Sequence, residues 1–77
     1  MVLTDIRKGD KAEIVKIHAD KELKDRLTSF GVMRGEVLSV KGCSLARKTM
    51  EIEVGSTLIA LRADEAEKIE IRQIDSE

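Results

Sequence analysis

The 77-residue sequence predicts a mainly β domain: a small five-stranded barrel with one amphipathic helix and one short helical turn. Three observations lead to this fold class. Short apolar segments recur between turn residues, a helix with its own capping residues interrupts them, and no linker or internal repeat divides the chain. A chain of this length forms one small domain, so residues 1–77 are taken as a single unit. Closing the sheet into a barrel removes its exposed edges.

The helix is predicted to begin after Asp20, whose carboxylate can accept backbone N–H groups of the first turn. Leu23, Leu27 and Phe30 then fall on one helical face, which predicts that all three pack into the core. Gly31 stands where a left-handed residue commonly ends a helix. The sequence therefore places a short amphipathic helix directly after the first strand.

The first predicted strand has apolar residues on both of its faces. Ile14 points to one side, and Val15 and Ile17 point to the other, so the strand is either covered on both sides or bulged. The five strands are predicted at residues 12–18, 36–41, 49–54, 57–62 and 68–74.

The later strands have simpler patterns. Residues 49–54 alternate strictly, with Met50, Ile52 and Val54 on one face, as in a half-exposed antiparallel strand. Residues 55–56 (Gly-Ser) are suited to a two-residue hairpin turn. Asp64 is predicted to cap a helical turn before the last strand, in which Ile69 and Ile71 face inward, and residues 42–48 are predicted to form a loop.

Composition narrows the function. Charged residues make up 38% of the chain, yet the formal net charge is only −1, which argues against a nucleic-acid binder. The single aromatic residue cannot supply the stacking platforms that such binders use. No apolar run is long enough to insert into a membrane and no signal peptide is visible, so a cytoplasmic location is expected.

Residues suited to catalysis or metal binding are few. His18 is the only histidine and Cys43 the only cysteine, and no pattern supplies either with a partner for nucleophilic catalysis. Glu51 and Glu53 share one strand face and are interpreted as solvated. The sequence predicts no enzyme and no cofactor. His18 and Cys43 remain weak candidates for ligating divalent iron or zinc.

Several segments, in order and spacing, resemble the FeoA family, the small cytosolic component of bacterial ferrous iron uptake. The matching residues are Leu3, Gly9, Ala12, Ile14, Arg26, Leu27, Phe30, Gly31, Val32, Gly35, Ile59–Arg62, Glu65, Ala66 and Ile69. The chain departs from the family at residues 46–49, Ala-Arg-Lys-Thr, where a turn resembling Gly-Asp-Pro is usual.

The resemblance implies an SH3-like barrel and a non-enzymatic role, with FeoB, a membrane-embedded iron transporter with a cytosolic GTPase domain, as partner. The fold also resembles the C-terminal domain of iron-dependent repressors. The alternative function is therefore a free-standing divalent transition-metal-binding or iron-sensing module. We expect the exposed side and exit of the helix to contact the partner through Lys24, Arg26, Met33 and Arg34, although Met33 could equally cover the core.

Overall fold

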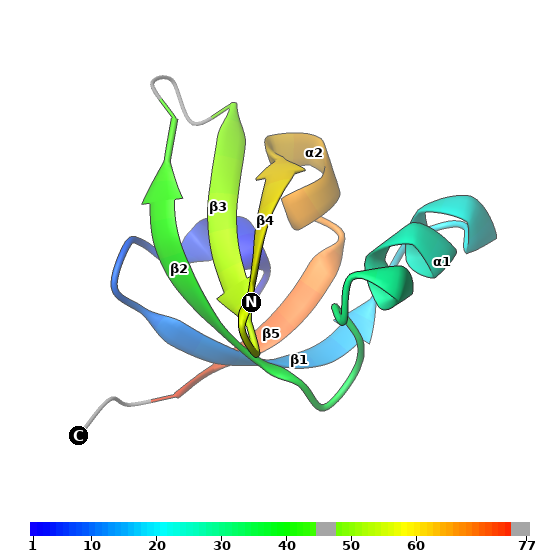
Figure 1. Cartoon of the computed structure of the whole chain (residues 1–77), viewed down its shortest axis with the longest axis horizontal. Helices are drawn as coiled ribbons and strands as arrows, with labels where there is room; N and C mark the ends of the chain where they lie inside the picture. Colours follow the sequence, from blue (N-terminus) through cyan, green and yellow to red (C-terminus); the bar gives the residue numbers. More distant parts are fainter. Residues whose placement is uncertain (45–47, 75–77) are drawn as a thin grey trace.

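The computed structural model describes residues 1–44 and 48–74, and it confirms a small, mainly β fold with two α-helices. All five strands and the amphipathic helix lie close to their predicted positions. In chain order the elements are η1 (Leu3–Asp5, a 3-10 helix), β1 (Lys11–Ile17), α1 (Lys21–Ser29), β2 (Val37–Cys43), β3 (Thr49–Val54), β4 (Thr57–Arg62), α2 (Ala63–Ala66) and β5 (Ile69–Ile74) (Figure 1).

The five strands form one antiparallel sheet in the order β4-β3-β2-β1-β5. The sheet curves strongly, but it does not close, so the predicted removal of both sheet edges is wrong. The outer edge of β5 is partly covered by the N-terminus, because Ile71 N donates to Met1 O at 2.8 Å and Val2 bridges Glu70. The outer edge of β4 pairs with no other strand in the described part of the chain.

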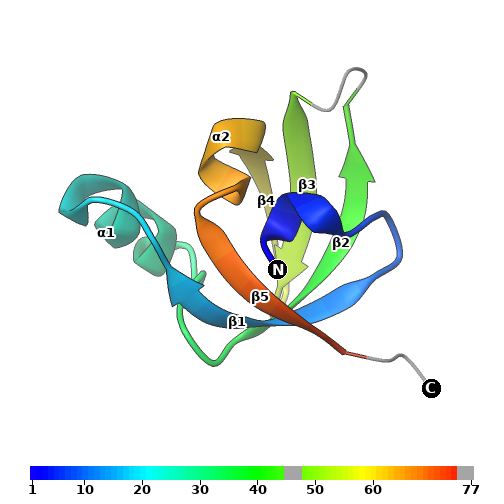
Figure 2. The same ribbon diagram turned by 180° about the vertical axis from the view of Figure 1, so that it is seen from behind.

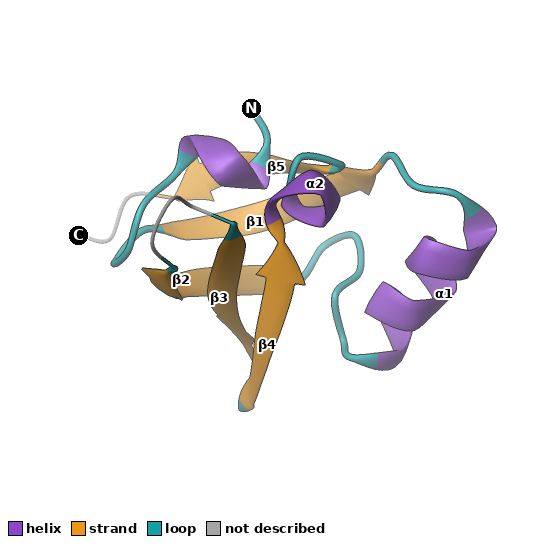
Figure 3. Cartoon of the chain, turned by 90° about the horizontal axis from the view of Figure 1, so that it is seen from above, coloured by secondary structure: helices purple, strands orange, loops and turns teal. Residues whose placement is uncertain are grey.

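The core fills the concave side of this sheet, and every buried side chain among the described residues is apolar. η1 and α2 contact each other and cover one end of the core (Figures 2 and 3). The predicted inward faces of two strands are confirmed by burial of Met50, Ile52, Val54, Ile69 and Ile71. With one aromatic residue in the chain, aliphatic side chains supply this core.

A β-bulge in β1 explains why its apolar residues did not follow a two-residue period. The pairing of β1 with β5 shifts by one residue between Ile14 and Lys16. The extra residue lets both Ile14 and Ile17 enter the core, although an odd separation would normally place them on opposite faces. Val15 stays only half-buried. The bulged interpretation of the first strand is therefore correct.

Two local predictions need correction. β2 has a register shift of its own and continues to Cys43, so the predicted loop at residues 42–48 starts later. Residues 45–47, which include two of the four residues of the atypical Ala-Arg-Lys-Thr segment, lie outside the described residues. Asp64 does not cap α2. The residue before α2 is Arg62, and its backbone N–H donates to Glu65 Oε1 at 3.1 Å, so an acidic residue one position later satisfies this end.

Candidate partner-binding surface

The helix α1 projects from one side of the sheet and is held by capping interactions at both ends (Figures 1 and 3). At its start, Leu23 N donates to Asp20 Oδ1 at 2.9 Å, as the sequence predicts. This bond satisfies one of the free N–H groups of the first turn. The start of the helix is thereby fixed directly after β1.

At the other end, α1 stops in a Schellman motif. Gly31 N donates to Thr28 O and Val32 N donates to Leu27 O, both at 2.9 Å. Gly31 has φ = +90°, the left-handed conformation predicted for it. Leu27 and Val32 are both completely buried, so the apolar contact that usually accompanies this motif anchors the helix end in the core.

The apolar face of α1 is narrower than its spacing suggested. Leu27 is fully buried and Leu23 packs partly against the core, but Phe30 is 47% exposed. The prediction that Phe30 belongs to the core is wrong. Phe30 is the last residue before the left-handed Gly31, and there the chain has already begun to leave the helical face.

Between α1 and β1 lies a groove of about 460 Å³. Its lining comes from four segments: the bulged end of β1, the exposed side of α1, the connection that follows α1, and the start of β5. The lining residues are Val15, Lys16, Ile17, Lys24, Thr28, Met33, Arg34 and Glu70. Three of the four residues predicted to contact a partner, Lys24, Met33 and Arg34, thus share one surface.

Backbone hydrogen bonds hold the connection after α1 against β1. Gly35 N donates to Ile14 O at 2.8 Å, and Ile14 N donates to Glu36 O at 2.9 Å. These bonds fall immediately before the β1 bulge, and they place Met33 and Arg34 beside Val15. The bulge and the helix stop therefore build the groove together.

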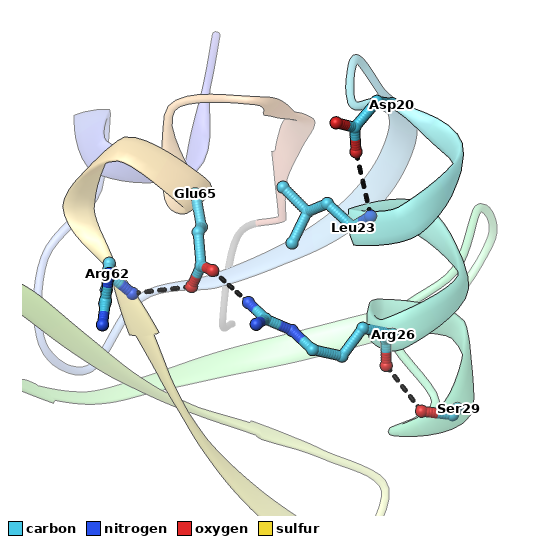
Figure 4. A network of polar contacts seen from close by, with 6 residues as sticks. All are labelled: Asp20, Leu23, Arg26, Ser29, Arg62 and Glu65. Carbon is cyan, nitrogen blue, oxygen red and sulfur yellow. Dashed lines mark hydrogen bonds and ion pairs between the residues drawn. The ribbon is translucent and has the colours of Figure 1, made fainter.

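Arg26, the fourth predicted contact residue, lies on a different side of α1. Its guanidinium forms an ion pair with Glu65 on α2, as Figure 4 shows. The same carboxylate accepts the backbone N–H of Arg62, so Glu65 joins α1 to the end of β4 (Figure 4). Arg26 also lines a separate pocket with Phe30 along β4. Arg26 thus connects two elements of the fold and takes no part in the groove.

The sequence reasoning missed Lys16 and Val15 as groove residues. Both lie on β1, where a strict two-residue alternation would put them on opposite faces. The available signal was the break in alternation between Ile14 and Ile17, which indicated a bulge without locating what it exposes.

Glu70, which lines the groove, is hydrogen-bonded to His18. His18 Nε2 lies 2.8 Å from Glu70 Oε1, and both side chains are roughly half exposed. The hydrogen bond from His18 lowers the pKa of the Glu70 carboxyl below its ordinary value, and the positive charge of Lys16 acts in the same direction. Glu70 therefore stays ionised at neutral pH.

The two weak candidates for metal ligation, His18 and Cys43, lie at opposite ends of the sheet. β1 and β2 run antiparallel with Lys11 opposite Ser39; His18 directly follows the end of β1, and Cys43 is the last residue of β2. They cannot ligate the same ion. Among residues 1–44 and 48–74, no group of three or more His, Cys, Asp or Glu side chains could hold a metal ion.

Cys43 instead borders a separate cavity of about 360 Å³ at the other end of the molecule. Arg7, Lys8, Met50 and Glu67 also line this cavity. Cys43 is exposed and unpaired, as expected for the only cysteine. In the described part of the chain, no helix is long and apolar enough to cross a membrane.

Comparison with known proteins decides the family. A family model described as the FeoA domain matches residues 1–73. The chain belongs to the FeoA family. A protein of Campylobacter jejuni provisionally named Fe(2+) transport protein A is 40% identical over 74 residues, which cover 96% of this chain and all of that protein.

Solved FeoA structures have the same fold. The solution structure of the FeoA protein from Chlorobium tepidum matches the whole chain with a TM-score of 0.93 at 27% identity, and this chain covers 73% of it. The SH3-like architecture predicted from the resemblance is confirmed, apart from closure of the barrel. The FeoA relatives are named as transport proteins, in agreement with the predicted non-enzymatic class.

Two further similarities bear on partner and fold. A Porphyromonas gingivalis protein named as a fusion of Fe(2+) transport protein A and Fe(2+) transporter FeoB is 28% identical over 76 residues; these are 99% of this FeoA-family chain but 9% of the fusion. The structure of a manganese-dependent transcriptional repressor matches 95% of this chain with a TM-score of 0.88 at 20% identity, and the match covers 40% of the repressor. This similarity concerns the fold alone.

Proposed function

We propose that this chain is a non-enzymatic accessory protein of bacterial ferrous iron uptake that docks in the cytoplasm on the cytosolic part of a FeoB transporter. The observation that carries the proposal is the Porphyromonas gingivalis fusion, in which a segment similar to this whole chain is joined to FeoB. Two domains fused in one protein remain at a high effective concentration, which favours a functional contact between them.

The surface of the chain supports a docking role. The groove beside α1 combines cationic and apolar side chains and is open to solvent, as expected of a contact site for another protein. The described residues contain no cluster that would suit a metal-dependent reaction. A binding role therefore fits this chain better than a catalytic one.

The direct test is a binding titration of the full chain against full-length FeoB from the same organism, reconstituted in nanodiscs of zwitterionic lipid. We expect saturable binding in the micromolar range or tighter, with empty nanodiscs as the control. Absence of binding at high micromolar concentration would overturn the proposal.

The alternative prediction, a divalent transition-metal-binding or iron-sensing module, is tested on the same preparation. Anaerobic calorimetry with Fe²⁺ and with Zn²⁺ would be run on the unmodified chain and on the His18→Ala/Cys43→Ser double variant. Because His18 and Cys43 lie at opposite ends of the sheet, we expect no ion held by both of them. Stoichiometric binding that the double variant loses would favour the alternative.

A further inference from the structure

We propose that the groove between α1 and β1 receives an acidic segment of the transporter that carries an apolar anchor side chain. The inference rests on the proposed function, and it adds the surface of this chain and the chemistry of the partner. It follows from the charge of the groove, from its apolar lining and from the way that the β1 bulge exposes both.

The groove has an excess of positive charge. Lys16, Lys24 and Arg34 line it, against a single carboxylate, Glu70. That carboxylate already accepts a hydrogen bond from His18. An anionic partner would therefore meet three cations and one acid that is already paired, although the chain as a whole is slightly acidic.

Lys24 and Arg34 of the groove differ from those basic residues that form ion pairs within the described part of the chain. Three other basic residues have carboxylate partners within the fold, in the pairs Arg26–Glu65, Lys41–Glu53 and Arg72–Glu13. Lys24 and Arg34, by contrast, enter no ion pair in the part of the chain that the structure describes. Their charges remain available to a partner without breaking an internal contact.

The apolar part of the groove favours a protein segment over other polyanions. Val15 is half-buried, Ile17 is almost fully buried, and Met33, which lines the groove with them, is 40% exposed. An unbranched thioether can adjust to the shape of an incoming side chain. No aromatic residue lines the groove, so it lacks the stacking surface that single-stranded nucleic acid uses.

The bulge in β1 is what brings charge and apolar surface together. Because of the extra residue, Val15 and the following Lys16 both line the groove, although Ile14 and Ile17 on either side face the core. Bulges commonly redirect side chains next to functional sites. A regular strand would present only one of these two residues to the partner.

The first experiment compares two charge-reversal variants of the full chain. Lys24→Glu/Arg34→Glu changes the groove, and Lys8→Glu/Lys11→Glu changes exposed cations towards the other end of β1. Both lower the net charge by the same amount, so general electrostatic steering is matched. Each is titrated against full-length FeoB in zwitterionic nanodiscs at two salt concentrations, after a thermal melt confirms folding.

We expect the groove variant to bind at least about tenfold more weakly than the unmodified chain, and the control variant to stay within about threefold. Higher salt should weaken the binding of the unmodified chain to FeoB more than it weakens the binding of the groove variant. Equal binding by both variants and the unmodified chain, or equal loss in both variants, would overturn the assignment of this groove while the proposed function stands. Failure of the unmodified chain to bind FeoB would overturn the proposed function and the assignment of the groove together.

A second experiment tests the apolar anchor without changing charge. Met33→Ser should weaken binding about five- to tenfold, and Met33→Leu should nearly preserve it. Val37→Ser is the matched control, since Val37 is 49% exposed and lies outside the groove lining. Equal effects of Met33→Ser and Val37→Ser would contradict the anchor.

Protein-free vesicles containing anionic phosphatidylglycerol provide the remaining comparison. We expect no binding that depends on Lys24 and Arg34. The inference would be overturned if the unmodified chain bound these vesicles and the groove variant lost vesicle binding as strongly as it loses transporter binding. That result would assign the groove to lipid headgroups.

Discussion

Replacing Gly31 with alanine measures how far the end of α1 depends on a left-handed backbone. Gly31 has φ = +90°, and its N–H completes the Schellman motif by donating to Thr28 O. A Cβ atom added there would lie 4.0 Å from Val54 Cγ1, which is an ordinary van der Waals contact. The substitution is therefore opposed by backbone strain and not by a steric clash.

The magnitude follows from two opposing terms. An L-residue in the left-handed region costs about 1–2 kcal/mol. Alanine also restricts the unfolded chain, which returns about 0.4–1 kcal/mol. We therefore expect Gly31→Ala to lower the free energy of unfolding by about 1 kcal/mol, equivalent to a decrease of about 4–8 °C in Tm for a domain of this size.

The assay is urea and thermal unfolding followed by far-UV circular dichroism, with Gly42→Ala as the control. Gly42 lies in a strand, has no positive φ and has open space at its Cβ position, so alanine there should be neutral or slightly stabilising. If Gly31→Ala were as stable as Gly42→Ala, the left-handed helix stop would not be the native conformation.

Other substitutions test burial and the ion pair at the groove. Leu27→Ala should lower the free energy of unfolding by about 2–5 kcal/mol because the Leu27 side chain is fully buried. Phe30→Ala should lower it by less than about 1.5 kcal/mol because almost half of the Phe30 side chain is exposed. Similar losses in urea unfolding of the two variants would contradict this description of α1. In His18→Ala, an NMR titration should show the pKa of Glu70 rising towards its ordinary value of 4.5, and an unchanged pKa would exclude the hydrogen bond as the cause. Because folding lowers the pKa of Glu70, its contact with His18 should stabilise the protein at pH values above the unfolded-state pKa of Glu70, and this contribution should be lost as the pH falls through the folded-state pKa. Urea unfolding of the unmodified chain and of His18→Ala across acidic pH would measure this contribution. Equal pH dependence of the two stabilities would contradict the prediction.

Local signals in the sequence predicted the fold well where one residue determines one conformation. Asp20 and Gly31 predicted the start and end of α1, because capping depends on a few neighbouring atoms. Closure of the sheet could not be predicted in this way. It depends on how far the curved strands approach each other, which no local pattern records.

The candidate site was only partly predictable for a similar reason. Met33 and Arg34 were expected at the exit of the helix, but the sequence fitted a core position for Met33 equally well; the structure exposes both residues. The separation of Arg26 from them depends on its ion pair with Glu65, 39 positions away in the chain. Lys16 was missed because its orientation depends on the register between β1 and β5. Such long-range pairing is not visible in the order of residues alone.

The outer edge of β4, which no strand among residues 1–44 and 48–74 covers, has a practical consequence for samples of this protein. Natural sheets commonly protect such edges from self-association with lysine, proline or a bulge. β4 has none of these, its one charge is Arg62 at its end, and Leu58 is 61% exposed on it. Concentrated samples are therefore expected to associate through β4, and a charged residue in place of Leu58 is the first change to make for long NMR or crystallisation experiments.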